Sequence, residues 1–362
     1  MGWTGIARDE HNRESLRYPS DLTDREWELT APFIPPAKSG GRRRTTDMRE
    51  VVNALLYIAS SGGAWRMLPK CFPPVSTVRR YFYAWRNAGL FETINTVLAM
   101  NLREIEGREA SPSAGVIDSQ SVKTTENGGV WGYDAGKKIR GRKRHILTDT
   151  CGFLIFILVH AADIQDRDGA VDVLKAVRFR FPWLRHVFAD GGYAGGKLRD
   201  ALEAHGSWTI EIIKRSDTAK GFVLLPRRWV VERTFAWLGR CRRLAKDWEK
   251  TIESSTAWTH IASIRMLTRR TARIATHDEL LNRALRPKRV SHSGTCHLLA
   301  VAVGFVRRRV SEARRARQPL PKYIVLLDHL ASRCGCGRGG GTQTGDWIIS
   351  VGGPITSGRK YP

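Results

Sequence analysis

The chain has 362 residues, 42% of them apolar, which excludes a largely disordered protein and allows two or three domains. Its 60 lysines and arginines against 35 aspartates and glutamates give a formal net charge of +25, which favours a polyanionic partner over a small metabolite. The longest apolar run, residues 153–162, is too short to span a membrane, so nucleic acid is the expected polyanion and no membrane partner is expected.

The amino-terminal stretch MGWTGIARDEHNRES carries charged residues and lacks the apolar core of a secretory signal, so a cytoplasmic location is expected by default. Six cysteines are scattered along the chain, and the single Cys-x-Cys pair among them does not have the spacing of a common zinc site. We therefore expect reduced thiols without a metal role.

Helical patterns dominate the first part of the chain. Thr23 and Glu26 have the spacing of a capping box at the start of a short helix. After a basic loop, Asp47 is the expected cap of a second helix that reaches about Ser61 and carries apolar side chains on one face.

A third helix is expected over residues 77–88, capped by Ser76 and joined to the second through a connection that contains glycine and proline. Its apolar residues would face inward, while Arg79 and Arg80 would lie on other faces. Two helices joined in this way predict either a helix-turn-helix with 77–88 as recognition helix, or a plain helical hairpin with solvated arginines. The residues alone leave both open.

From about Ala114 the pattern changes to short β-like runs. They read GVIDS, RHILTD, FLIFILVHA, HVFAD and WTIEIIK, with helical patterns before and after the fourth. This order predicts an α/β domain of the RNase H type, with a mixed five-stranded sheet in which the first and fourth strands are neighbours.

Neighbouring first and fourth strands would bring Asp118 and Asp190 to one sheet edge. Two carboxylates placed together in apolar surroundings raise each other's pKa, because ionising both is unfavourable there. A bound divalent cation removes this unfavourable free energy. A third ligand is expected from the helix that reads RRWVVERTFAWLGRCRRL, where Glu232 lies beside the core face with Arg228 one turn earlier. On a helical wheel of this segment, Gly239 and Arg243 fall on the same stripe as Glu232. The alternative is an ordinary surface ion pair between Arg228 and Glu232.

The stretch FADGGYAGGKL has the glycine and lysine spacing of a phosphate-binding loop, with Gly191, Gly196 and Lys197. Leu198 stands where that loop needs a hydroxyl, so no nucleotide cradle is expected. We interpret the glycines as a sharp turn after Asp190, and Lys197 as an incidental basic residue or a phosphate contact.

Six basic residues lie close together between the first two expected strands. Their functional interpretation is a phosphate clamp beside the carboxylates, and the alternative is a solvated charged face. They are Lys137, Lys138, Arg140, Arg142, Lys143 and Arg144.

Five blocks in this order resemble the bacterial insertion-sequence transposases of the DDE class, in the group named after insertion sequence five. They are VIDSQSVKTTENGG, GYDAGKKIRGRKRHIL, HAADIQDRDGA, FADGGYAG and LPRRWVVERTFAWLGRCRRLAKDWE. The resemblance covers about residues 17–274. It implies an RNase H-like core whose Asp-Asp-Glu triad falls on Asp118, Asp190 and Glu232. In the accessory motif that the family has on this helix, Arg228 matches the arginine position. Leu225 stands at the tyrosine position and Gly239 at the lysine position, and Arg240 directly follows Gly239.

The resemblance also implies chemistry and partners. The triad would hold two Mg²⁺ ions, with Mn²⁺ as a possible substitute, and would cut the ends of the element and join the freed 3′-hydroxyl to target DNA. Arg79 and Arg80 would read the element ends in the major groove, Arg228 would meet a phosphate, and two protomers would pair on nucleoid DNA.

Four segments are expected on this basis. Residues 1–16 form an extension, 17–108 a helix-turn-helix domain, 112–274 the catalytic domain, and 275–362 a basic extension that is poorly ordered or contacts DNA. A DNA-binding regulator without catalysis and a plain metal-dependent nuclease are the alternative functions.

Overall fold

A computed structural model describes residues 12–37, 43–126, 128–178, 180–203, 205, 208–213 and 226–285. Leu225 and the extension beyond residue 285 lie outside the described residues, as do residues 1–11. Within the described part, no helix is both long and apolar enough to cross a bilayer.

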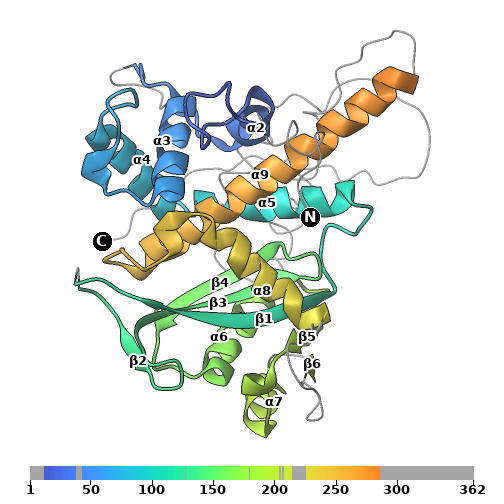
Figure 1. The fold of residues 1–362 in the computed structure, drawn as a ribbon. Coiled ribbons are helices and arrows are strands. Elements are labelled where there is room, and N and C mark those ends of the chain that lie inside the picture. Colours follow the sequence, from blue (N-terminus) through green and yellow to red (C-terminus); the bar gives the residue numbers. More distant parts are fainter. Residues whose placement is uncertain are drawn as a thin grey trace, which may run out of the picture.

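The amino-terminal part is helical (Figure 1). Its elements are α2 (Asp24–Thr30), η1 (Ala31–Phe33), α3 (Met48–Ser61), η2 (Trp65–Met67), α4 (Val75–Asn87) and α5 (Leu90–Ile105). The described residues before Arg17 are attached to it, because Arg13 forms an ion pair of 2.8 Å with the buried Glu26.

The helix caps follow local sequence, with one exception. The predicted capping box of Thr23 and Glu26 is confirmed, and Asp47 caps α3 by accepting a hydrogen bond of 2.8 Å from the amide of Arg49. The predicted cap at Ser76 is wrong, since α4 begins at Val75, two residues before the predicted start at 77, and its N-cap is Pro74. Pro74 itself holds the N-cap position with a ψ of 138°, and its ring offers no side-chain hydrogen bond, so the helix begins without a side-chain cap.

The remainder forms a mixed sheet with helices on both faces. Its strands are β1 (Ala114–Lys123), β2 (Gly132–Asp134), β3 (Ile139–Asp149), β4 (Leu154–Ala161), β5 (His186–Ala189) and β6 (Thr209–Ile212). The prediction that the first and fourth of the expected strands are neighbours is confirmed, because β1 pairs with β5 in parallel. Within the described residues the sheet has six strands and not five. The additional β2 has three residues, too few to produce a periodic pattern, and pairs with the start of β3 beside β4.

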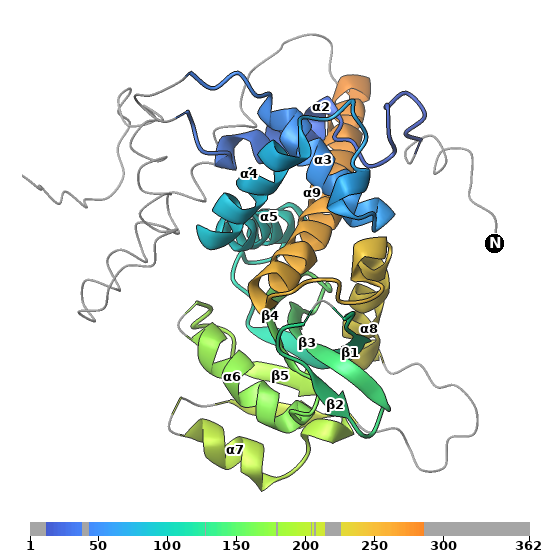
Figure 2. The same ribbon diagram turned by 90° about the vertical axis from the view of Figure 1, so that its left-hand side faces the viewer.

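Side chains alternate between the two faces of this sheet. Ile117 and Leu147 point to the face covered by α6 (Asp166–Arg178) and α7 (Gly196–Glu203). Val116 and Ile146 point to the opposite face, which is covered by α8 (Pro226–Gly239), as Figure 2 shows. We call these the α6 face and the α8 face.

The amino-terminal helices share a core with α8, α9 and Phe153, which directly precedes β4. Helix α9 (Ile252–Leu285) follows the short η4 (Arg242–Leu244) and runs alongside α5, with its first turns near β4 (Figure 1). The indole of Trp258 on α9 stacks on Phe82 of α4 at a centroid distance of 4.8 Å. One apolar cluster therefore contains residues from both sides of the expected boundary near residue 110.

Candidate active site

Asp118 and Asp190 lie in the same row of the sheet. The parallel β1–β5 register pairs Val116 with Phe188. Asp118 lies two residues after Val116, and Asp190 lies two residues after Phe188. Because side chains alternate, both carboxylates point to the α8 face, on which Val116 and Phe188 are buried.

The half-buried carboxyl of Asp118 is difficult to ionise. Burial, together with the charge of Asp190, raises its pKa to about 7, although the amide of Ser119 opposes the shift by donating a hydrogen bond of 2.7 Å. A nearby cation favours the charged form of such a group. Asp118 therefore has the environment of a cation ligand.

Arg228 links Asp190 to Glu232. Its guanidinium is 3.7 Å from Oδ2 of Asp190 and 3.0 Å from Oε1 of Glu232, one turn later on α8. Asp190 also accepts a hydrogen bond of 2.8 Å from the amide of Gly192, which holds the turn η3 (Gly191–Tyr193) behind it. The pair of Arg228 and Glu232 is thus part of a larger cluster, and not an isolated surface ion pair.

The three carboxylates lie on the same face of the sheet, but they do not form a single metal-binding cluster. Among the described residues, no three histidine, cysteine, aspartate or glutamate side chains are grouped closely enough to hold one metal ion. The guanidinium of Arg228 supplies the positive charge between Asp190 and Glu232. The donor set nevertheless fits a hard divalent cation, because all three candidate ligands are carboxylates.

The stripe predicted on α8 is shorter than the wheel suggested. Val231 and Leu238 are buried and form the core stripe beside Glu232, but α8 ends at Gly239. Arg243 therefore lies in η4, where it is buried and paired with Glu249 at 2.6 Å.

A buried polar network on the α6 face was missed from sequence. The hydroxyl of Tyr193 lies 2.8 Å from Nε2 of His145, and Nδ1 of His145 is 3.5 Å from Nε2 of His160. Burial lowers the pKa of His145 to about 3, so its imidazole is neutral. The available signal was a pair of histidines inside two apolar strand patterns.

Half of the predicted phosphate clamp is wrong. Arg142, Lys143 and Arg144 lie in the middle of β3, where all three are buried and have partners within the protein. Lys143 pairs with Asp166 at 2.9 Å, and Arg144 donates a hydrogen bond of 2.7 Å to the carbonyl of Leu244. These side chains are not available to DNA.

The exposed basic residues remain candidates for DNA contact. Lys137, Lys138 and Arg140 are exposed, and Nζ of Lys137 is 3.3 Å from the carbonyl of Ser119, next to Asp118. Arg79 and Arg80 are exposed on α4, the candidate recognition helix.

Comparison with known proteins agrees with this geometry. Residues 109–267 match the family described as "Transposase DDE domain", and residues 22–95 match the family described as "Putative transposase of IS4/5 family". The chain belongs to the insertion-sequence transposases of the DDE class.

Two relatives match parts of the chain. An "Uncharacterized protein y4sN" from Sinorhizobium fredii is 34% identical over 106 residues, which cover 29% of this chain and 78% of that protein. The "Putative transposase for insertion sequence element IS402" from Burkholderia cepacia is 34% identical over 120 residues, covering 30% of this chain but only 54% of that protein. No solved structure matches the chain significantly.

Family membership accounts for the site in coarse terms. It implies that the chain binds DNA and that its chemistry depends on a divalent metal ion. The carboxylates on β1, after β5 and on α8 are the candidates to hold such an ion.

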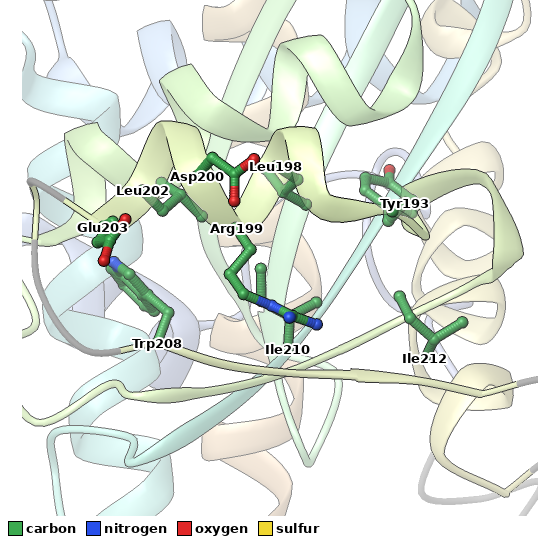
Figure 3. A pocket seen from close by; sticks show the side chains of 10 residues that line it. Tyr193, Leu198, Arg199, Asp200, Leu202, Glu203, Trp208, Ile210 and Ile212 are labelled. Atoms are coloured by element: carbon green, nitrogen blue, oxygen red, sulfur yellow. The ribbon is translucent and has the colours of Figure 1, made fainter.

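A cavity of about 470 Å³ lies elsewhere, between α7 and β6 (Figure 3). Leu198, Leu202 and Ile210 line it together with the ring of Tyr193, and Arg199 and Trp208 extend along it. None of the three carboxylates belongs to its lining, so this cavity is not the candidate active site.

Proposed function

We propose that this transposase cuts the ends of an insertion sequence and joins the freed 3′-hydroxyl to target DNA at Asp118, Asp190 and Glu232. The observation that carries the proposal is the shared row of Asp118 and Asp190, with Glu232 linked to Asp190 through Arg228. On this proposal the chain works in the cytoplasm, on double-stranded nucleoid DNA.

Two Mg²⁺ ions, for which Mn²⁺ can substitute, would supply activation of the attacking oxygen and stabilisation of the leaving oxygen in an in-line displacement. The three carboxylates would hold them, and the amide of Gly192 fixes the orientation of Asp190. Arg228 then exchanges its carboxylate partners for a DNA phosphate, a ligand that its planar guanidinium suits.

The basic residues around the site position the DNA. Lys137 and Lys138 lie exposed at the turn before β3, and Lys137 is within reach of the strand that carries Asp118. Arg79 and Arg80 on α4 are proposed to contact the element end in the major groove. Two protomers are proposed to assemble when two element ends are bound.

The test is cleavage and strand transfer on labelled DNA that carries the ends flanking the gene, with Mg²⁺. The full chain is compared with Asp190→Asn, Glu232→Gln and the control Asp200→Asn, which changes an exposed carboxylate on α7. Both reactions should be lost in Asp190→Asn and Glu232→Gln and kept in the control.

The alternatives give different results. Cleavage without strand transfer would indicate a plain nuclease, and DNA binding without either reaction would indicate a regulator. Equal activity of the full chain and Asp190→Asn would overturn the assignment of the triad. Mass photometry of the DNA-bound and free chain tests whether protomers pair only on DNA.

A further inference from the structure

The hairpin of β2 and β3 exposes an unusual group of large apolar side chains. Val130, Trp131 and Tyr133 are 55%, 46% and 53% exposed, although they lie within four residues of one another. The guanidinium carbon of Arg140 is 3.7 Å from the ring centroid of Trp131, so a cation already lies against this indole. Grouped exposed aromatic residues of this kind mark interaction sites more often than single ones do.

Strand register places this group on the face of the sheet that carries Asp118. Tyr133 pairs directly with Arg140, so the two side chains share a face. Along β3 every second residue from Arg140 to Ile146 points to this side of the sheet, and Ile146 pairs with Asp118. Between them, Arg142 and Arg144 are covered by the segment of residues 244–250. Trp131 lies two residues before Tyr133, so its side chain is on the same face. We call Trp131, Tyr133 and Arg140 the aromatic platform.

Charges are separated between the two faces of the hairpin. Asp134 lies on the α6 face, where it is buried and 3.7 Å from Lys143. Asp163 is on that face as well, since a Cβ at Gly132 would lie 1.9 Å from its Oδ1. The platform itself carries Arg140, so its charge suits a polyanion.

The base of the hairpin is held rigidly. Buried Arg142 donates hydrogen bonds of 2.7 Å to the carbonyl of Val130 and of 2.9 and 3.1 Å to the carbonyls of Glu249 and Lys250. The backbones are so close that a Cβ at Gly129 would lie 2.1 Å from the carbonyl oxygen of Lys250. A surface that is ordered before binding loses little entropy when a ligand stacks on it.

We propose that the aromatic platform is a stacking site for unpaired bases of the DNA strand that reaches Asp118 and Asp190. This inference rests on the proposed function. Aromatic side chains beside basic ones bind single-stranded DNA because every base offers a flat face for stacking while its phosphates meet the cations.

The distance along the strand sets where the bases lie. Ile146, the partner of Asp118, lies six positions after Arg140 on β3, which corresponds to about 20 Å at the usual rise of a strand. A strand that keeps the duplex rise of about 3.4 Å per nucleotide covers this distance in about six nucleotides, so the platform would meet bases about that far from the reacting phosphate.

The experiment measures binding of the full chain to labelled duplexes of the element end by fluorescence anisotropy, in EDTA so that no DNA is cut. The duplexes carry single-stranded thymidine tails of two, six or ten nucleotides at the reacting end. The six- and ten-nucleotide tails should bind on the order of tenfold tighter than the two-nucleotide tail. Trp131→Ala should abolish this gain, and Trp131→Phe should keep most of it.

Trp183→Ala is the matched control, because Trp183 is 56% exposed and precedes β5 at the opposite end of that strand from Asp190. The gain should survive in this control. The proposal is overturned if all tail lengths bind the native chain alike, or if Trp131→Ala keeps the gain. It is also overturned if Trp131→Ala changes only the number of protomers on a blunt duplex, since the surface would then join two copies of the chain.

Failure of this inference can be told apart from failure of the proposed function. Duplex binding and Asp190-dependent cleavage without a tail-dependent gain would leave the transposase chemistry intact and remove the platform. A gain that depends on Trp131 in a chain that never cuts DNA would support the platform and remove the chemistry.

Discussion

The hydroxyl of Tyr193 lies 2.8 Å from Nε2 of His145, and both side chains are buried. Tyr193 ends the turn η3, which begins directly after Asp190, so this hydrogen bond ties the turn to β3. The position of Asp190, a candidate metal ligand, therefore depends on how the α6 face of the sheet is packed.

Replacing Tyr193 with phenylalanine should remove this tie. Tyr193→Phe leaves a buried imidazole nitrogen of His145 without this partner, which should lower the free energy of unfolding by about 1–3 kcal/mol. DNA cleavage should slow because Asp190 is held less firmly. Thermal unfolding and cleavage rates check both effects, with Tyr81→Phe on α4 as the control. Equal behaviour of the two variants would mean that the hydrogen bond has no role.

Gly169 on α6 should not accept a methyl group. A Cβ there would lie 2.7 Å from Nδ1 of His145 and 2.8 Å from Nε2 of His160. Alanine normally stabilises a helix relative to glycine, but here the helix or the two buried imidazoles must shift to make room, so Gly169→Ala should destabilise by about 1–3 kcal/mol. Denaturant unfolding measures this against Gly239→Ala, where no atom lies within 4 Å of the added group. A stabilised Gly169→Ala would contradict the packing described.

The sequence was sufficient to predict where the three candidate carboxylates lie in the fold, because each depends on local pattern. Asp118 and Asp190 interrupt or end apolar strands, and parallel pairing of those strands follows from the order of elements. Glu232 lies beside the apolar stripe of a helix. Short-range periodicity therefore carries most of the fold and the positions of the site residues.

The basic block shows what local pattern cannot supply. In a strand, adjacent residues point to opposite faces, so a run of cations cannot form one surface. Whether Arg142 is exposed depends on Asp247 and the carbonyls of Glu249 and Lys250, about a hundred residues later. The buried bond between Tyr193 and His145 has the same origin, since its partners are 48 residues apart. Such pairs appear only once the strands and helices are packed.

Arg142 and Arg140 should behave oppositely although they are two residues apart on β3. Arg142 is fully buried and 3.2 Å from Asp247, so Arg142→Ala leaves a buried carboxylate unpaired and should destabilise the fold by about 3–5 kcal/mol. Arg140→Ala should leave the melting temperature nearly unchanged and weaken DNA binding, more so at low salt. Calorimetry and anisotropy titrations on both variants separate the two effects. A stable Arg142→Ala with weakened DNA binding would restore the original phosphate-clamp interpretation.

Acid should destabilise the protein in part through His260 on α9. This imidazole is buried, and desolvation together with the charge of Arg180 lowers its pKa from 6.5 to about 3. The unfolded chain therefore takes up a proton below about pH 6.5 that the folded chain refuses, so stability is present above that pH and is lost as the pH falls toward 3. Each such group contributes about 1.4 kcal/mol per pH unit in that window.

In His260→Gln the loss of unfolding free energy between pH 7 and pH 5 should be smaller by about 2 kcal/mol, as measured by urea unfolding. From pH 7 to 8 the variant and the native chain should run parallel, because the histidine is neutral in both states there. A variant that loses as much stability as the native chain between pH 7 and pH 5 would assign the acid sensitivity to other groups, of which buried His145 is the first to test.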